Sequence, residues 1–250
     1  MAFEGLIAFG LTLLSFLVIQ RWLHHEMQVF FYLLTRRSNL AVILFSILLL
    51  PGVVLHELSH VLFAKLLCVP LRGFSLLPRM LPNGQLQLGS VQTSKTDFLR
   101  DALIGVAPFF IGTLVVSHLG SNYLGLKTLL PFLLQANWQG LLPQALVLTQ
   151  QPDFWLWFYL TFTISSTMIP SAADRRAWWA VAVALGIFSV VAFLAGIGQW
   201  LALTLWPLLN RALLTLGLIL GMALTIHLVL AIPIWGINRL LFRAQRALAH

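Results

Sequence analysis

Long runs of apolar residues, almost free of charge, constrain this chain more than any other feature. Residues 178–206, which begin "WWAVAVALGIF", contain no charged residue, and about 20 apolar residues suffice for a helix to cross a bilayer. Of the 250 residues, 60% are hydrophobic and 9% are charged, whereas soluble domains carry about 25% charged residues. Because a helix satisfies its backbone hydrogen bonds internally, we predict an all-α polytopic membrane protein, built as a single membrane-embedded domain over 1–250.

Six segments are long and apolar enough to be predicted as membrane spans. They cover residues 3–20, 40–67, 101–119, 154–173, 178–206 and 212–236. Residues 21–39 combine three arginines with an amphipathic "MQVFFYLL" and are predicted to lie at the membrane interface. Residues 126–152 are apolar but are interrupted by Pro131, Gly140 and Pro143. We interpret them as a re-entrant or interfacial segment, with a seventh span as the competing interpretation.

The distribution of basic residues predicts the orientation in the membrane. With six spans, ten of the 15 Lys and Arg residues fall on one side of the bilayer and five on the other. The positive-inside rule then places both termini and the 68–100 loop in the cytoplasm. We assign the formal net charge of +8 to such loops, which face anionic lipid. The sequence carries no nucleic-acid-binding motif, so no nucleic-acid partner is expected.

Residues 70–96 form the long polar stretch between the second and third predicted spans. Asn83-Gly84 is a strong turn signal for a hairpin, and "QLQLGSVQ" after it alternates polar and apolar residues at the period of a strand. The pattern predicts a small β-hairpin at the cytoplasmic surface of the membrane. A simple connector is the alternative.

The motif "HELSH" lies inside the second predicted span. In a helix, positions i and i+4 share one face, so His56 and His60 can offer two imidazoles to one metal ion. Glu57 lies beside them and is placed to act on a water molecule as a general base. This is the H-E-x-x-H arrangement of zinc hydrolases, in which zinc polarises a carbonyl and lowers the pKa of a water molecule to ~7.

The membrane context makes this motif more specific than its five residues alone. The chain contains three glutamates and seven histidines, and three of these ten residues fall together in one apolar run. Ionisable residues within spans are rare and usually mark functional sites. The alternative is a buried polar cluster that forms hydrogen bonds between helices.

A catalytic zinc site needs a third protein ligand, and depth in the membrane leaves two candidates. Asp174 and His227 lie about 20 and about 15 residues into spans that run in the same direction as the second span. We prefer Asp174 as the ligand, with a surface ion pair to Arg175 or Arg176 as the alternative. For His227, a hydrogen bond between helices is the preferred interpretation, although the residue would still line the site.

The sequence before Asp174 supports this preference. Pro170 weakens a helix and frees backbone carbonyls, and irregular backbone at membrane depth is tolerated where it lines a cavity. Ser166 and Thr167 add hydroxyl groups there. We therefore expect Ser166, Thr167 and Pro170 to line the site.

The motifs resemble those of the site-2 protease family of intramembrane zinc metalloproteases. The resemblance rests on "HELSHVLFAKLLCVPLRGFSLLP", on a small residue, Ala64, four positions after the motif, on "GVAP" at 105–108, and on Asp174 after Pro170. It covers about a third of the chain. The sequence departs from the family's second motif of Asn, Pro and Asp-Gly, because the asparagine is absent and Arg175 stands in place of the glycine.

The resemblance implies a function and a role for each site residue. Zn²⁺ would be bound by His56, His60 and Asp174, and Glu57 would be the catalytic base. The expected activity is an intramembrane zinc metalloendopeptidase whose site lies within the bilayer near the cytoplasmic face, and whose partner is a transmembrane or membrane-associated peptide or protein substrate. A non-catalytic metal-binding scaffold or an ion-conducting protein is the alternative of a different class. Another membrane zinc hydrolase is a third possibility.

Overall fold

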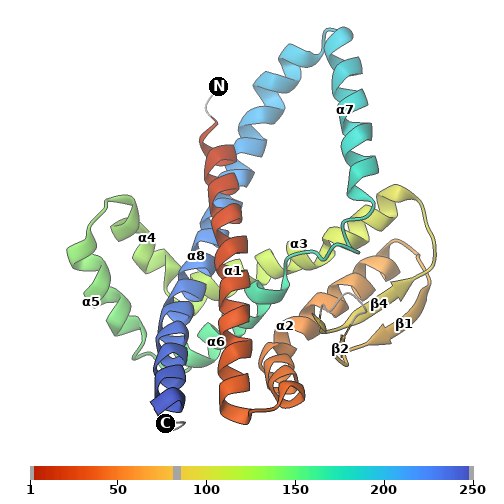
Figure 1. The fold of residues 1–250 in the computed structure, drawn as a ribbon. Coiled ribbons are helices and arrows are strands. Elements are labelled where there is room, and N and C mark those ends of the chain that lie inside the picture. The colour runs from red at the N-terminus through yellow and green to blue at the C-terminus, as the bar shows by residue number, and fades with distance from the viewer. Residues whose placement is uncertain (1–2, 81–85, 248–250) are drawn as a thin grey trace.

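The computed structural model describes residues 3–80 and 86–247. Within these residues the chain is mainly helical, with four short strands between the second and third helices (Figure 1). The elements are α1 (Glu4–Thr35), α2 (Ser38–Leu66), β1 (Leu71–Ser75), β2 (Arg79–Met80), β3 (Leu86–Gln87), β4 (Ser90–Thr93), α3 (Phe98–Asn122), α4 (Leu126–Leu134), α5 (Trp138–Leu148), α6 (Phe154–Thr167), α7 (Trp178–Leu194) and α8 (Gly198–Ala247).

Four helices in the described part of the chain have the length and hydropathy needed to cross a membrane. They are α1, α2, α3 and α8. α7 is also apolar, but its 17 residues make it shorter than these four. The chain is therefore a polytopic, mainly helical membrane protein, as its apolar runs predict.

The boundary between the last two predicted spans lies elsewhere in the structure. The sequence predicts spans 178–206 and 212–236, but α7 ends at Leu194 and α8 begins at Gly198. Gly196 adopts a φ of 76°, in the left-handed region that glycine enters without steric cost, and the chain turns there. α8 then continues through Pro207 as one helix of 50 residues.

Two other segments can be compared with their predicted places. Residues 21–35, predicted to be interfacial, continue α1 without a break. Residues 126–152 hold α4 and α5, of 9 and 11 residues, which at 1.5 Å per residue reach only about 14–17 Å. They leave the body of the molecule as a pair of short helices (Figure 1), which agrees with a re-entrant or interfacial segment and not with a seventh span. The break falls at Ala136, where φ is 50°, rather than at the prolines.

α1 and α8 pack side by side and run in the same direction (Figure 1). Near one end, the Gly5 N–H donates to Asn210 Oδ1 at 3.0 Å, and towards the other, Asn238 Nδ2 donates to the Glu26 carbonyl at 2.9 Å. The two ends of the chain therefore lie at opposite ends of this pair. The prediction that both termini lie in the cytoplasm is not supported by this arrangement. α6 and α7 run in one direction, against α1 and α8, rather than as two opposed spans (Figure 1).

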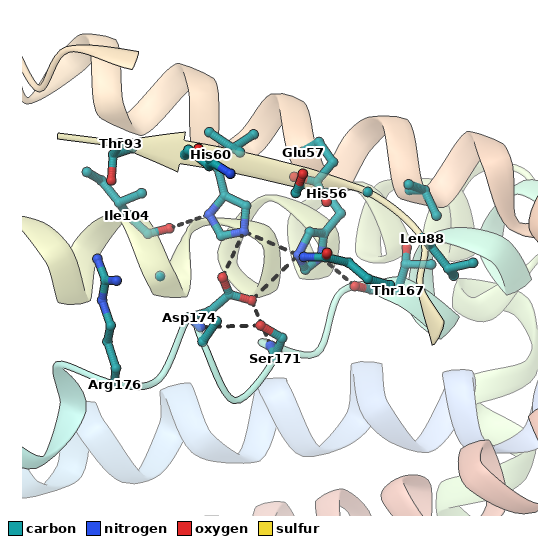
Figure 2. A pocket seen from close by; sticks show the side chains of 18 of the residues that line it. His56, Glu57, His60, Leu88, Thr93, Ile104, Thr167, Ser171, Asp174 and Arg176 are labelled. Atoms are coloured by element: carbon teal, nitrogen blue, oxygen red, sulfur yellow. Dashed lines mark hydrogen bonds and ion pairs between the residues drawn. The ribbon is translucent and has the colours of Figure 1, made fainter. Parts of the chain in front are cut away.

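The polar stretch between α2 and α3 forms strands, as predicted. β1 pairs with β4 and β2 pairs with β3, both antiparallel. The register runs from Leu71 opposite Thr93 to Ser75 opposite Ser90, with an irregularity at Arg72. The predicted Asn83-Gly84 turn lies outside the described residues. β4 lies along α2, next to the HELSH motif (Figure 2).

α6 is the helix about which the interior is organised. One set of its side chains packs in an apolar cluster with residues of α1, α2 and α8, and another set packs in a second cluster with residues of α1, α3 and α8. Phe162 belongs to the first cluster and Ile164 to the second. Because lipid tails are as apolar as these side chains, close packing rather than removal from water holds such helices together. The last turn of α6 is thereby fixed between α1, α2 and α3.

Candidate metal centre

The two histidines of the motif lie one turn apart on α2 (Figure 2). The helix is continuous through the motif, so the predicted i, i+4 relation is confirmed, and His60 Nε2 lies 3.2 Å from His56 Nε2. His60 is buried, whereas the His56 side chain retains 14% of its exposure. Both Nε2 atoms point towards the segment that connects α6 to α7 (Figure 2).

Asp174 reaches the histidines from that segment, far along the chain. Its Oδ1 lies 3.3 Å from His60 Nε2, and its Oδ2 lies 3.7 Å from His56 Nε2. A reciprocal pair of hydrogen bonds shapes the segment: the Ser171 N–H donates to Asp174 Oδ2 at 2.7 Å, and the Asp174 N–H donates to Ser171 Oγ at 3.3 Å. His56, His60 and Asp174 form a potential metal site, because their ligand atoms all lie within 4.8 Å of one another. Among the described residues, this is the one group of three or more His, Cys, Asp or Glu side chains that meets this condition.

Backbone carbonyls fix the orientation of both imidazoles. His56 Nδ1 lies 2.6 Å from the Thr167 carbonyl oxygen, and His60 Nδ1 lies 2.9 Å from the Ile104 carbonyl oxygen. Because a carbonyl can only accept, each Nδ1 must carry the proton. Each Nε2 therefore presents a lone pair to the other histidine and to Asp174. Metal-binding histidines are typically oriented in this way by a second hydrogen bond.

The three donors fit a tetrahedral metal ion. Two ligand atoms that are each about 2.0–2.1 Å from such an ion lie about 3.3–3.5 Å apart. Here the two Nε2 atoms lie 3.2 Å apart, and the two nitrogen–oxygen distances, each to a different oxygen of Asp174, are 3.3 and 3.7 Å. Two imidazoles and one carboxylate also match the number of protein ligands in catalytic zinc sites, which leave the fourth position for water or substrate.

The carboxyl group of Asp174 is ionised, as a ligand must be. Burial by itself raises the pKa of Asp174, but the nearby imidazoles of His56 and His60 and the hydrogen bond from Ser171 outweigh this effect. The pKa consequently lies well below its usual range. The alternative ion pair of Asp174 with Arg175 or Arg176 is not formed, because Arg176 pairs with another carboxylate and the Arg175 Nε donates to the Ser171 carbonyl.

Glu57 lies in the wall of the same cavity but outside the group of ligand atoms. Its side chain is buried beneath the turn that joins β3 to β4. A Cβ atom at Gly89 would lie 2.7 Å from Glu57 Oε1, so glycine allows the backbone of this turn to approach the carboxylate. Glu57 is therefore placed to act on a molecule in the cavity rather than to hold an ion.

The first two turns of α3 support the centre from the other side. The Ile104 carbonyl holds His60, and at Gly105 a Cβ atom would collide with the Asp174 carbonyl oxygen. Asp101 receives two hydrogen bonds of 2.8 Å from the Arg176 guanidinium, and this pairing raises the pKa of Arg176 above its usual value. The Asp174 segment therefore rests on α3 with its backbone in direct contact.

A cavity of about 610 Å³ surrounds these groups. Its walls come from α2, from the start of α3, from the end of α6 and the segment after it, and from β3 and β4 with the turn between them. Figure 2 shows β4 crossing above His60 and Glu57, with Thr93 at one end and Leu88 at the other. The histidines thus lie in a space that extends along one edge of a strand.

The remaining predicted site residues differ in whether they line the cavity. Ser166 and Thr167 line the cavity, as predicted. Pro170 does not line the cavity. It lies three residues after Thr167, where α6 ends. His227 is fully buried and does not join the ligand group; its Nδ1 donates to the Ala223 carbonyl at 2.7 Å, and its Nε2 accepts from Ser166 Oγ at 2.9 Å. The preferred interpretation of His227, as a hydrogen-bonded histidine between helices, agrees with this geometry.

Several contributors to the site are not among the predicted residues. Ile104 acts through its backbone carbonyl, which has no helical N–H partner because the residue four positions later is Pro108. Gly89 and Gly105 act by lacking a Cβ atom, and "GVAP" pointed to Gly105 only as a family likeness. Gln20 contacts the end of α6. Its amide side chain within a long apolar helix was the feature of the sequence that could have indicated a role for Gln20.

No protein-family model, curated protein or solved structure matches the chain.

Proposed function

We propose that this chain is an intramembrane zinc metalloendopeptidase. The observation that carries the proposal is the meeting of His56 and His60 with Asp174, beside Glu57, inside a protein made of apolar helices. A largely buried group of two imidazoles and two carboxylates at membrane depth is costly and is functional by default. The donor set favours zinc, because imidazole and carboxylate ligands in a three-residue set are typical of hydrolytic zinc sites.

The residues around the proposed zinc have separate roles. His56, His60 and Asp174 would hold the ion, with the Thr167 and Ile104 carbonyls keeping each imidazole in the required tautomer. When bound, zinc would supply Lewis-acid activation of water and of a substrate carbonyl. Glu57 would accept a proton from the attacking water and deliver it to the amine that leaves when the peptide bond breaks. The overall reaction is hydrolysis, in which one water molecule is added across one peptide bond to give a carboxylate and an amine.

The substrate that suits this site is an extended segment of a membrane-embedded chain. A peptide bond within a helix has its carbonyl in the hydrogen-bond ladder and must be unwound before attack. β4 pairs with β1 on one edge, and its other edge faces the cavity without a strand partner among the described residues (Figure 2). Strand addition along this edge would hold the peptide extended over Glu57.

We further propose that the cavity opens towards the cytoplasm. The strand region and the start of α3 that border it carry Arg72, Lys95 and Arg100. Short loops rich in Lys and Arg are retained on the cytoplasmic side. Labelling of single cysteines placed in this region, in intact cells and in inverted vesicles, tests the orientation.

Metal analysis beside a cleavage assay tests the function. The purified wild-type protein should hold one zinc per chain, and His56→Ala and Asp174→Ala should lose it, whereas His227→Ala should keep it. Glu57→Gln should also keep zinc but should lower the cleavage rate of a single-span model substrate by about 10²–10⁴-fold.

Each other outcome has a definite meaning. Wild-type protein without stoichiometric metal refutes the proposal. Bound metal with no cleavage of any membrane substrate favours the alternative of a non-catalytic metal-binding scaffold. Zinc retained by Asp174→Ala moves the third ligand to another residue.

A further inference from the structure

The end of α6 leaves two neighbouring carbonyls without their helical partners. In a continuing helix, the Ser166 carbonyl would accept from the N–H of residue 170, but that residue is proline and has no N–H. The Thr167 carbonyl would accept from the N–H of Ser171, which instead donates to Asp174 Oδ2 at 2.7 Å. Both carbonyls are therefore free to accept hydrogen bonds from other parts of the protein.

Each of the two carbonyls meets one side chain from another helix. The Thr167 carbonyl oxygen lies 2.6 Å from Nδ1 of His56, which orients that imidazole. The Ser166 carbonyl oxygen accepts from Gln20 Nε2, also at 2.6 Å. Gln20 belongs to α1 and is buried, with 8% of its surface exposed. The two contacts involve adjacent residues, so Gln20 and His56 bear on the same turn of backbone.

The two bonds are coupled through the rigidity of this turn. A buried carbonyl left without a donor at membrane depth costs several kcal/mol, so loss of the Gln20 amide would favour a rotated or unwound last turn of α6. Because the Thr167 carbonyl is on that turn, its direction relative to His56 would change with it. The Ser166 side chain is held separately, by its hydrogen bond to His227.

We propose that Gln20 is a positioning residue for the metal centre. Its amide anchors the Ser166 carbonyl, which keeps the Thr167 carbonyl aimed at His56, and the Nε2 lone pair of His56 is thereby aimed at the metal position. Gln20 touches neither metal nor substrate. The proposal rests on the metal-binding part of the proposed function, and it makes α1 a contributor to a centre whose ligands lie on other segments.

A matched pair of variants separates this role from simple packing of α1. Gln20→Met and Asn238→Leu each replace a buried amide at the packing surface of α1 with an apolar side chain of similar size. Asn238, on α8, donates to the Glu26 carbonyl at 2.9 Å and to Glu26 Oε2 at 2.7 Å, and it lies outside the cavity. Gln20→Met removes one hydrogen bond of α1 and Asn238→Leu removes two, but only Gln20→Met changes the end of α6.

Titration with Co²⁺, which adopts the geometry of zinc and absorbs visible light, measures the effect directly. We expect Gln20→Met to weaken Co²⁺ binding about 10-fold, the low end for loss of an outer partner of a metal ligand, and to alter the visible spectrum of the bound ion. Asn238→Leu should lower the unfolding temperature without either change. Gln20→Glu should recover most of the affinity, because burial favours the protonated acid, which keeps one O–H donor for the Ser166 carbonyl.

The outcomes distinguish this proposal from the proposed function. Equal Co²⁺ affinity and an equal spectrum in wild type and Gln20→Met overturn the role of Gln20 and leave the metal centre intact. The same loss of affinity in Asn238→Leu also overturns it, since the effect would then come from general loosening of α1. Wild-type protein that binds no Co²⁺ or Zn²⁺ overturns both proposals.

Discussion

Single residues set the metal centre largely through their backbones. The two histidines are aimed by carbonyls of Thr167 and Ile104, and the Asp174 segment touches α3 where Gly105 has no Cβ. A carbonyl held in a helix end cannot rotate freely as a side chain can, so it fixes an imidazole more firmly. The centre is therefore sensitive to changes that alter no ligand.

Gly105→Ala tests this sensitivity. The added methyl group would collide with the Asp174 carbonyl oxygen, so the carboxylate must move away from His60. We expect zinc affinity to fall at least about 10-fold, measured by competition with a chromophoric chelator. Gly10→Ala is the control, because nothing lies within 4 Å of a Cβ atom there. Unchanged affinity in Gly105→Ala would show that the Asp174 segment is not held by this contact.

At the scale of elements, the strands and α2 enclose the proposed base between them. The β3–β4 turn lies so close to Glu57 that a Cβ at Gly89 would come within 2.7 Å of its carboxylate. The three atoms nearest to that Cβ position all belong to Glu57, and none belongs to a ligand of the proposed zinc. A disturbance of the turn should consequently reach the base before it reaches the metal.

Gly89→Ala should therefore separate catalysis from metal binding. The methyl group would force the Glu57 side chain to shift, and a misplaced catalytic group costs about 10-fold or more in kcat. Zinc content should stay at the wild-type level, since no ligand is touched. Cleavage kinetics and metal analysis on the same preparation check both halves, and a parallel loss of zinc would place Glu57 among the ligands instead.

Residues that act through their side chains could be predicted from the sequence further than residues that act through their backbone carbonyls. His56, Glu57 and His60 follow from the motif and helix periodicity. Counting depth along the spans left two candidates for the third ligand, of which Pro170 and the hydroxyl residues near it favoured Asp174. The carbonyls of Ser166 and Thr167 depend on which helix lies opposite, which no local pattern states. Gln20 could be seen only as a polar residue in an apolar run, without its partner.

Helix boundaries likewise depend in part on tertiary contacts that the local sequence does not indicate. The sequence predicts two spans divided between residues 206 and 212, but α8 runs through this stretch, where the Gly5 N–H of α1 donates to Asn210 Oδ1. The true turn is at Gly196, whose left-handed backbone is compatible with glycine but not required by it. Tertiary packing thus decided where the two helices are divided.

At the scale of the molecule, the proposed zinc joins α2 to the segment between α6 and α7. Ions that bind only the folded state stabilise it in proportion to the logarithm of their free concentration, by about 2.7 kcal/mol at 100 times the Kd. We expect the unfolding temperature of the purified protein to rise with zinc and to fall when a chelator is added. His60→Ala should remove this dependence, and a zinc response that survives in His60→Ala would point to binding elsewhere.

The parallel packing of α1 with α8 also has a consequence for biosynthesis. Asn238 and Glu26, which join the two helices, are 212 residues apart in the chain, so α1 must wait for the synthesis of α8 before its packing is complete. Gln20, which is also on α1, contacts the end of α6 through the Ser166 carbonyl. A nascent chain would thus hold both histidines and Asp174 before α1 has its final neighbour, and the finished centre would form only after the C-terminal helix has left the ribosome. Truncation within α8 would leave the site residues in place and their framework unfinished.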